Sequence, residues 1–384
     1  MKRSEILKIY GTEYRENTIR LLEEADLISL IPDRNCRIAV KPNLVSPSPA
    51  SFGATTHTEV VSGIIEYLQS HGCTSITLME GSWVGDRTQD AVETCGYDTL
   101  CRKYHAPFID TQKEPAVSRS CKGMELKICR CVQDIDFLIN VPVMKGHCQT
   151  KVTCALKNLK GLIPNQEKRR FHAMGLHKPI AYLNAAIRQD FIVVDHICGD
   201  LDFEDGGNPV VRNCIMAARD PVLTDSYAAY LMGYDKTEIP YLQLAEDLGI
   251  GTTDLEKAEV RILGGGEQEK PLPKSGKVVE LSDAVYEVES CSACYGYLLP
   301  ALDRLKQEGL LEPLMKILGE SDTRLCIGQG FRGKNGKLGI GSCTSGFDWS
   351  VKGCPPTETE IFLKLKELIQ SSGHPECGSA VRNC

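Results

Sequence analysis

Four cysteines near the C-terminus have the residue type and spacing needed to bind a metal centre. Cys291 and Cys294 are separated by two residues, Cys343 lies in a Gly-Ser-Cys-Thr segment, and Cys354 is followed by proline. Two cysteines at this spacing can bind one centre from a single turn, and a cysteine before proline is typical of bacterial ferredoxin sequences. We therefore expect these four thiolates to hold one 4Fe-4S cluster.

A structural zinc site and a set of metal-free cysteines are the alternatives. Zinc ribbons normally present two Cys-x-x-Cys pairs, whereas this region contains one. The chain has 18 cysteines, and buried cysteines often behave as small hydrophobic residues. Cys326 has strand-like neighbours, so we expect it to be buried and Cys343 to be the ligand. Four further cysteines are interpreted as buried free thiols: Cys36, Cys73, Cys198 and Cys214.

Residues 357–369 are predicted to form the last helix of the chain. Proline suits the first turn of a helix, and Pro355 and Pro356 stand just before this segment. Cys354 is therefore expected at a helix N-terminus, where the helix dipole favours a thiolate.

The composition is that of an ordinary globular protein. The 384 residues are enough for two domains, with 42% hydrophobic and 25% charged residues. The N-terminus has no apolar stretch behind its basic start, and no run of about 18 apolar residues follows, so we expect a cytoplasmic protein without membrane contact. Reduced cysteines fit a reducing, anaerobic cytoplasm. The net charge of −7 argues against nucleic-acid binding.

Short apolar runs alternate with amphipathic stretches between residues 36 and 263 and predict an α/β fold, with an open, mostly parallel sheet flanked by helices. Ligands usually bind beyond the carboxyl ends of such strands. The predicted strands are residues 37–41, 75–79, 137–143, 191–194 and 260–263, and the predicted helices are residues 59–70, 152–159, 179–188 and 221–231.

The chain is expected to divide into two domains. An α/β domain covers residues 1–264, a linker rich in glycine, proline and charge covers residues 265–280, and a smaller C-terminal α/β iron-sulfur module covers residues 281–371. The remaining residues, 372–384, are expected to be a flexible tail in which Cys377 and Cys384 are incidental.

A basic segment stands out in this acidic chain. Residues 145–178 contain eight lysines or arginines and one acidic residue, which gives a local excess of +7. Within it, Thr150, Thr153, Lys157 and Lys160 recur at helical spacing and are predicted to share one helix face. An anion site and a solvated basic helix face are both consistent with this pattern.

Polar residues in the loops after strands extend the candidate anion site. Converging ammonium and imidazolium groups would bind a carboxylate, phosphate or sulfate and would lower one another's pKa, which makes them usable as acids or bases. Asp195 and Asp225 are candidate counter-charges or acid/base groups, and Glu80 has the same standing. The candidate catalytic residues are Lys145, His147, Lys157 and Asp195. The candidate ligand-binding residues are Lys41, Asn43, His57, Glu80, Asn158, Lys160, His172 and Asp225.

All of these residues except Glu80 and His172 lie in stretches that resemble the domain of unknown function 362 family, and the resemblance spans residues 36–255. The matching stretches are Lys-Pro-Asn-Leu at 41–44, Thr-Thr-His at 55–57, Asn-Val-Pro-Val-Met-Lys-Gly-His at 140–147, Ala-Leu-Lys-Asn-Leu-Lys-Gly at 155–161, Val-Asp at 194–195 and Asp-Pro-Val-Leu-Thr-Asp at 220–225. The resemblance implies an iron-sulfur module on the same chain. Many relatives carry an insert with two Cys-x-x-Cys-x-x-Cys runs, which is absent here, so a single cluster is expected.

Two classes of function follow. The first is an iron-sulfur oxidoreductase or electron-transfer protein that acts on a small anionic substrate, with a ferredoxin-type electron donor and a homodimer as candidate partners. The second is a non-redox lyase or isomerase, in which the cluster is structural or a Lewis acid and a lysine or histidine moves the proton. A non-catalytic binding or maturation protein is a third alternative.

Overall fold

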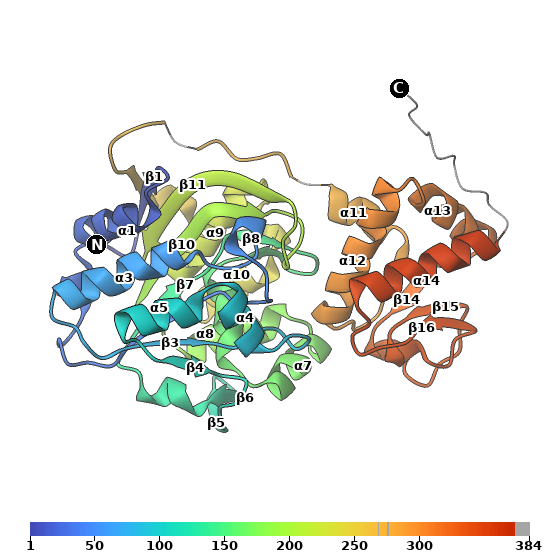
Figure 1. Ribbon diagram of the computed structural model, residues 1–384, viewed down its shortest axis with the longest axis horizontal. Helices are drawn as coiled ribbons and strands as arrows, with labels where there is room; N and C mark the ends of the chain where they lie inside the picture. The colour runs from blue at the N-terminus through green and yellow to red at the C-terminus, as the bar shows by residue number, and fades with distance from the viewer. Residues whose placement is uncertain (268, 275, 373–384) are drawn as a thin grey trace. The chain divides into compact units, whose positions relative to one another are not determined.

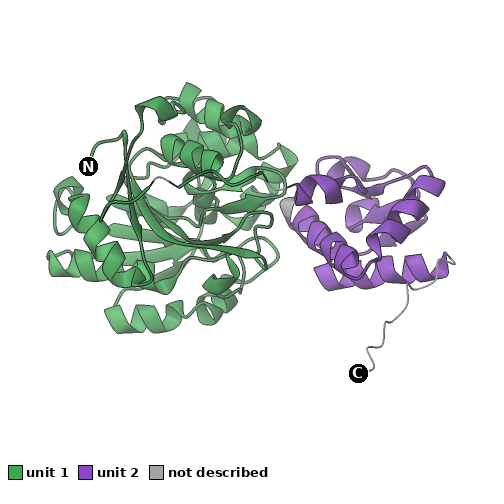
Figure 2. Ribbon diagram, turned by 90° about the horizontal axis from the view of Figure 1, so that it is seen from above, with its two compact units in different colours: residues 1–275 green, residues 276–384 purple. Residues whose placement is uncertain are grey.

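The computed structural model describes residues 1–267, 269–274 and 276–372, and it divides into two compact units, residues 1–275 and 276–384 (Figure 2). The division lies within the predicted linker, but that linker ends in helix α11 (Lys277–Ser282). Its earlier part is fixed to unit 1, because the Glu269 carboxylate lies 3.0 Å from the buried Lys8 ammonium. Apart from residue 372, the predicted flexible tail, with Cys377 and Cys384, falls outside the described residues.

Unit 1 is built on an eight-stranded sheet in the order β12-β1-β11-β10-β7-β2-β3-β4 (Figure 1). Only the pairs β1–β11 and β10–β11 are antiparallel within this described sheet, so the predicted open, mostly parallel sheet is confirmed. The strands are β1 (Glu5–Tyr10), β2 (Ile38–Pro42), β3 (Ile76–Glu80), β4 (Phe108–Asp110), β7 (Phe137–Val141), β10 (Phe191–Asp200), β11 (Pro209–Ala218) and β12 (Glu259–Ile262).

Helices cover both faces of this sheet and bury one apolar core on each. Side chains alternate along a strand, so Ile38 and Val40 of β2 enter one core while Ala39 enters the other. The first core lies under α1 (Tyr14–Glu24), α2 (Leu27–Leu30), α3 (Thr58–Ser70), α4 (Thr88–Thr94) and α5 (Tyr97–Tyr104). The second lies under α6 (Ala155–Asn158), α7 (Asn165–Ala173), α8 (His177–Ala186), α9 (Pro221–Leu231) and α10 (Pro240–Asp247).

The predicted helix over residues 152–159 is wrong in its first part and is confirmed only from Ala155 on. Lys151–Thr153 form strand β9, which pairs with β8 (Lys145–His147) as a small hairpin, because β-branched residues around position 152 suit a strand. Helix α6 has a single turn and continues into the 3-10 helix η3 (Leu159–Leu162). Thr150 and Thr153 therefore do not share a helix face with Lys157 and Lys160. A further hairpin, β5 (Ala116–Cys121) with β6 (Met124–Cys129), was also not predicted.

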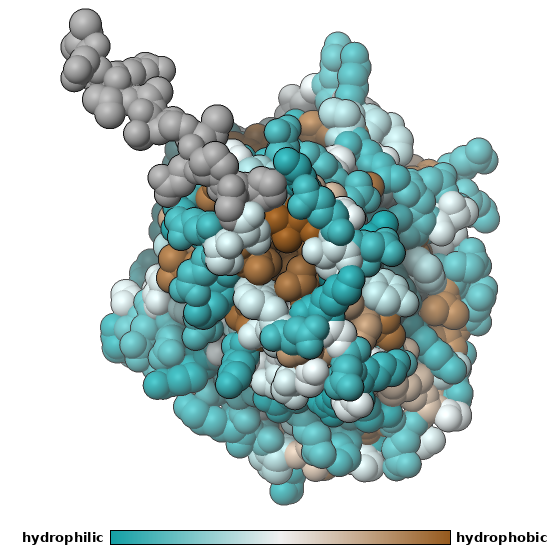
Figure 3. Space-filling view, turned by 90° about the vertical axis from the view of Figure 1, so that its right-hand side faces the viewer, coloured by the Kyte–Doolittle hydropathy of each residue, from teal (hydrophilic) through white to brown (hydrophobic). Residues whose placement is uncertain are grey.

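Unit 2 is the smaller α/β module. Its four-stranded parallel sheet has the order β13-β14-β15-β16 and is packed against four helices in the described residues. Hydrophilic residues predominate on the face seen in Figure 3, where the hydrophobic ones form small patches. The elements are α11, β13 (Val285–Glu287), α12 (Ser292–Gln307), α13 (Leu311–Glu320), β14 (Leu325–Ile327), β15 (Leu338–Ile340), β16 (Trp349–Val351) and α14 (Glu358–Ser371).

The placement of Cys354 at a helix N-terminus is a correction to the sequence prediction. Thr357 is the N-cap of α14 and forms a capping box with Glu360, so Cys354 stands three residues before the cap, outside the helix. Cys291 is instead the N-cap residue of α12. No helix in the described part of the chain is long and apolar enough to cross a membrane.

Gly63 allows α1 and α3 to pack closely, and replacing it should destabilise unit 1. A Cβ at this position would lie 2.6 Å from the Arg15 carbonyl oxygen and 2.8 Å from Thr18 Cβ. We expect Gly63→Ala to lose about 1–3 kcal/mol through overpacking, which outweighs the gain of about 1 kcal/mol in helix propensity. In Gly319→Ala, the control in α13, the added Cβ meets nothing within 4 Å. Calorimetry of both full-length variants would contradict this account if Gly63→Ala unfolded at or above the wild-type temperature.

Candidate functional site

A buried ion pair and two amides connect the ends of three neighbouring strands. Lys41, at the end of β2, pairs with Glu80, at the end of β3, and its Nζ donates to Asn158 Oδ1 at 3.2 Å. Asn158 in turn donates to Asn140 Oδ1 of β7 at 2.7 Å. The backbone approaches closely here, because a Cβ at Gly161 would lie 1.7 Å from Glu80 Oε1. These contacts fix the positions of the charged and amide side chains next to which the other basic residues of the site lie.

Four lysines and a histidine take part in these contacts or lie close to them. We call these residues, Lys41, Lys145, Lys157, Lys160 and His147, the basic cradle. All except Lys160 are less than 4% exposed, and Lys160 is partly exposed. The sequence placed these residues in loops or on a helix, and the structure brings them together from β2, β8, α6 and η3. A solvated basic helix face, the alternative interpretation, does not fit side chains this buried.

Lys145 is held by oxygen acceptors. Its Nζ donates to the carbonyl oxygens of Ala54 and Glu204, the latter at 2.7 Å, and lies 3.3 Å from Asn43 Oδ1. Burial lowers the pKa of Lys145 to about 7, and the neighbouring Lys157 adds to this effect. Lys145 is therefore an ammonium group that can lose its proton near neutral pH.

Glu204 supplies the main counter-charge of the basic cradle. It lies in the loop between β10 and β11 and forms an ion pair with Lys157, and its Oε2 lies 3.1 Å from His147 Nε2. Burial alone would raise the pKa of Glu204, but Lys157 and His147 hold it well below the usual value. Glu204 was not among the predicted site residues, because nothing in the chain around position 204 indicates a partner 47 residues away.

His147 is neutral in this environment. Its Nδ1 accepts hydrogen bonds from the backbone N–H groups of Gln149 at 3.0 Å and Thr150 at 3.1 Å, so this nitrogen carries no proton. Burial lowers the pKa of His147 to about 4, with a further contribution from Lys157. The expected imidazolium is thus replaced by a neutral imidazole whose Nε2 faces the Glu204 carboxylate.

His172 and Lys168 extend the cradle. Lys160 Nζ lies 3.4 Å from His172 Nε2, and burial, with Lys157, lowers the pKa of Lys160 to about 7. Lys168 of α7, which the sequence analysis did not select, donates to the carbonyl oxygens of Gly81 at 3.0 Å and Ser82 at 2.7 Å. Burial lowers the pKa of Lys168 to about 8. The position of Lys168 within the basic segment was the only sequence signal for it.

Asp195 and Asp225 do not act as counter-charges to the cradle lysines in their described contacts. Asp225 accepts from the backbone N–H groups of Ala155 at 2.7 Å and Leu156 at 3.2 Å, and so caps α6. Asp195 accepts from His57, both from its backbone N–H at 2.7 Å and at Nδ1 at 2.8 Å. Asp225 therefore positions the helix that carries Lys157, and Asp195 belongs with His57 in a separate cluster.

The four predicted metal-binding cysteines of unit 2 line one pocket. Cys291 and Cys294 come from the start of α12, Cys343 from the 3-10 helix η7 (Ser342–Thr344), and Cys354 from the loop after β16. Cys326 does not line this pocket, and its thiol donates towards the Arg324 carbonyl oxygen at 3.7 Å. Burial, with the neighbouring cysteines, raises the pKa of Cys294 to about 12. The Cys294 thiol would therefore need a compensating positive charge to ionise.

Nitrogen donors and glycines complete this cysteine pocket. Gln329 Nε2 donates to Cys291 Sγ at 3.5 Å, and Arg332 Nε donates to Cys343 Sγ at 3.4 Å. Gly341 has a φ of +87°, and a Cβ there would lie 3.8 Å from Cys294 Sγ. No group of three or more His, Cys, Asp or Glu side chains in the described residues is arranged to hold a single metal ion. The donor set of four thiols with N–H groups beside them fits a larger thiolate-bound centre.

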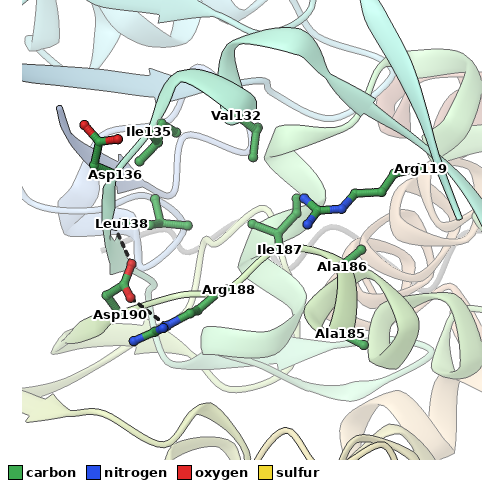
Figure 4. A pocket seen from close by; sticks show the side chains of 10 residues that line it. All are labelled: Arg119, Val132, Ile135, Asp136, Leu138, Ala185, Ala186, Ile187, Arg188 and Asp190. Atoms are coloured by element: carbon green, nitrogen blue, oxygen red, sulfur yellow. Dashed lines mark hydrogen bonds and ion pairs between the residues drawn. The ribbon is translucent and has the colours of Figure 1, made fainter. Parts of the chain in front are cut away.

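A second pocket of unit 1 lies towards the opposite end of β7 from the cradle. It is lined by residues that include Arg119, Leu138 and Asp190 (Figure 4). Its Asp190 carboxylate is already engaged, because it accepts from Leu138 N at 3.0 Å and pairs with Arg188 Nε at 2.8 Å. No cradle residue lines this pocket, so it is not the candidate site.

The Glu204 counter-charge should make a pH-dependent contribution to stability. A carboxyl whose folded pKa is lowered stabilises the fold above its unfolded pKa of about 4.3 and loses this effect as pH falls below it. We expect Glu204→Gln to lose about 3 kcal/mol at neutral pH, because it leaves buried cations unpaired, and the difference from wild type to shrink in acid. Urea unfolding at several pH values measures it.

Glu238→Gln is the matched control. Glu238 pairs with Lys151 and Lys274 nearer the surface, with 28% of its side chain exposed. Its loss should cost about 1 kcal/mol or less. Equal effects of the two substitutions would show that Glu204 is not the main counter-charge of the cradle.

Comparison with known proteins found a curated relative and solved structures that are partly similar to this chain. A thylakoid-associated protein of Synechocystis sp. is 24% identical over 227 residues, which cover 57% of this chain and 70% of that protein. The apoprotein of lactate racemase from Thermoanaerobacterium thermosaccharolyticum is 14% identical, with a TM-score of 0.38, and the match covers 56% of this chain and 54% of the racemase chain. A protein from Thermotoga maritima is 13% identical, with a TM-score of 0.36, over 62% and 59% of the two chains.

The family model gives the firmer result. The model described as domain of unknown function (DUF362) matches residues 38–230, which contain the whole basic cradle. This match spans half of the chain, and the chain therefore belongs to the DUF362 family.

Proposed function

We propose that this chain is an iron-sulfur protein with one 4Fe-4S cluster, and that it works as an oxidoreductase or electron-transfer protein on a small anionic ligand. The observation that carries the proposal is the convergence of Cys291, Cys294, Cys343 and Cys354 on one pocket, while Cys326 lies outside it. Three separate segments of unit 2 supply these thiols. A ferredoxin-type protein is the proposed electron donor.

The cysteine pocket favours a cluster over zinc. A cluster separates its ligand sulfur atoms more widely than a single ion does, which agrees with thiols that share a pocket without forming a single-ion site. When bound, the cluster would supply single-electron transfer. The N–H groups of Gln329 and Arg332 would then stabilise the negative charge on Cys291 and Cys343, and hydrogen bonds to the sulfur atoms are a known influence on the reduction potential of such centres.

The basic cradle supports a carboxylate or phosphate ligand. The carboxylate of Glu204 already lies between Lys157 and His147, so a carboxylate has the size and charge that these side chains accommodate. A ligand that displaced Glu204 would meet the Lys157 ammonium, the His147 imidazole and the nearby Lys145. Charge-assisted hydrogen bonds of this kind are about twice as strong as neutral ones.

Proton transfer in the basic cradle, the chemistry of a lyase or isomerase, is a second candidate function. The observation that favours it is the pair of lysines, Lys145 and Lys160, whose pKa burial lowers to about 7. A group with this pKa is partly protonated at neutral pH, which suits a general acid or base. In this case the cluster would be structural or would bind the substrate as a Lewis acid.

The cluster proposal predicts the metal content of the purified protein. After anaerobic purification we expect about four irons and four sulfides per chain and an electron paramagnetic resonance signal after dithionite reduction, as for a 4Fe-4S centre with Cys₄ ligation. Cys343→Ala should lose this signal and most of the iron. Cys326→Ala is the matched control from the same unit and should keep both, because Cys326 does not line the pocket.

Zinc in place of iron, or equal iron in the two variants, would contradict the assignment. A cluster that dithionite does not reduce would favour the proton-transfer function over electron transfer.

Anion binding to the basic cradle should weaken as pH rises. Lys145 and Lys160 lose their protons around pH 7, so calorimetric titration with oxalate or sulfate should show falling affinity from about pH 6 to about pH 9. Lys157→Met should weaken binding about tenfold or more at the lower pH, because one charge-assisted hydrogen bond is lost.

Lys151→Met provides the control for this experiment. Lys151 belongs to the neighbouring strand β9 but pairs with Glu238, with 39% of its side chain exposed. Its removal should leave oxalate affinity within about twofold of the wild type, as expected for a weak surface ion pair. Unchanged binding in Lys157→Met would remove the basic cradle as the anion site.

A further inference from the structure

A cysteine, a histidine and an aspartate meet on the sheet face opposite the basic cradle. Cys198 and Asp195 belong to β10, and His57 precedes the first turn of α3. Cys198 Sγ lies 3.9 Å from His57 Nε2, and His57 Nδ1 lies 2.8 Å from Asp195 Oδ2. We call these three residues the Cys198 triad. The sequence analysis treated Cys198 as a buried free thiol, and its burial is confirmed at 4% exposure.

The hydrogen bonds fix the orientation of the imidazole. Asp195 is fully buried and accepts from the His57 backbone N–H at 2.7 Å and from the Ile197 backbone N–H at 3.1 Å, so its carboxylate cannot turn away. The remaining short contact is with His57 Nδ1, which must carry a proton to donate to a carboxylate. Nε2 is therefore the nitrogen that faces the thiol. Cys198, His57 and Asp195 are thus in contact in the same order as the nucleophile, the general base and the orienting carboxylate of a catalytic triad.

A local bulge places the thiol beside His57. The pairing of β10 with β11 shifts its register between His196 and Cys198, which breaks the regular alternation of side chains along the strand. Cys198 Sγ also lies 3.4 Å from the carbonyl oxygen of Ala50. This second acceptor belongs to the 3-10 helix η1 (Ala50–Phe52), which packs against β10, and its neighbour Phe52 is 53% exposed. The thiol thus lies beneath a short, partly exposed segment.

The charge of the triad supports an activated thiol. Burial would lower the pKa of His57, but the Asp195 carboxylate raises it to about 10. An imidazolium beside Cys198 stabilises a thiolate, which is the reactive form of cysteine. A structural role for His57, as the residue that begins α3, would need the Asp195 contact but would give no reason for a thiol at Nε2.

We propose that Cys198 is a nucleophilic thiol, activated by His57 and Asp195, that accepts the acyl group of a small activated ester or thioester. The proton shared between Cys198 Sγ and His57 resides on Nε2, which leaves Cys198 as a thiolate, and the thiolate sulfur atom adds to the acyl carbonyl carbon. The bond from this carbon to the leaving group breaks, and the leaving alcohol or thiol takes the proton from His57. Attack by water on the resulting Cys198 thioester releases the acid and restores the thiol. No electron donor or acceptor is required.

The test is the rate at which individual cysteines react in the full-length protein. Peptide mass spectrometry after short exposure to iodoacetamide or p-nitrophenyl acetate, at slightly acidic pH, should show Cys198 modified about tenfold faster or more than Cys95. Cys95 is the internal reference, because it is more exposed and its thiol also donates to a carbonyl oxygen, that of Ser48 at 3.2 Å. The other described contact of its thiol is with Thr55 Oγ1 at 3.6 Å.

Variants separate activation from simple access. His57→Gln should slow the reaction of Cys198 about 100-fold, the usual contribution of a general base, and leave Cys95 unchanged. Asp195→Asn should slow it less. Circular dichroism and the modification rate of Cys95 report whether each variant is folded. The ratio of the Cys198 and Cys95 modification rates in the wild type tests whether Cys198 is activated without the use of any variant.

Three results would overturn the proposal. They are equal rates for Cys198 and Cys95 in the wild type, a folded His57→Gln variant with unchanged Cys198 reactivity, and acetylation by p-nitrophenyl acetate only at other residues. An iodoacetamide reaction without acetylation would overturn the acyl-transfer step.

Discussion

The ion pairs of Glu204 are the constraint on which the basic cradle depends. Lys157 and Lys145 are buried close together beside the neutral His147, and like charges at this depth repel one another strongly unless a counter-charge is present. Glu204 provides that charge with its carboxylate and a further acceptor with its carbonyl oxygen. The loop between β10 and β11 is therefore held in place by the same groups that are proposed to bind an anion.

The sheet explains how residues far apart in sequence reach this site. Parallel strands β2, β3 and β7 end at the same edge, and their last residues supply Lys41, Glu80 and Asn140. Asn158 joins them by accepting from Lys41 and donating to Asn140. Amides suit this position because each one both donates and accepts, which leaves fewer buried polar atoms without a partner.

The sequence predicted five of the eight strands of the main sheet, β2, β3, β7, β10 and β12, because apolar runs and the polar residues that follow them are local features. It did not predict β1, β4 or β11. It did not predict the β8–β9 hairpin, since the alternation of Thr150, Val152 and Thr153 fits both a helix face and a short strand. Partners that meet only through the fold were also missed. Glu204 and Lys168 have no local motif, and Cys198 looked like any other buried cysteine until β10 and α3 brought it to His57.

Burial lowers the pKa of the basic groups on both faces of the sheet, and the neighbouring charges decide the net result. In the basic cradle, low polarity and neighbouring cations lower the pKa of Lys145 and Lys160 to about 7, so these lysines can release protons at neutral pH. On the other face a single carboxylate, Asp195, outweighs burial and keeps His57 charged. One β-sheet thus supports a site that exchanges protons and, separately, a fixed imidazolium beside a thiol. The two sites differ because the fold places Glu204 among several cations of the basic cradle, whereas it places Asp195 beside the single imidazole of His57.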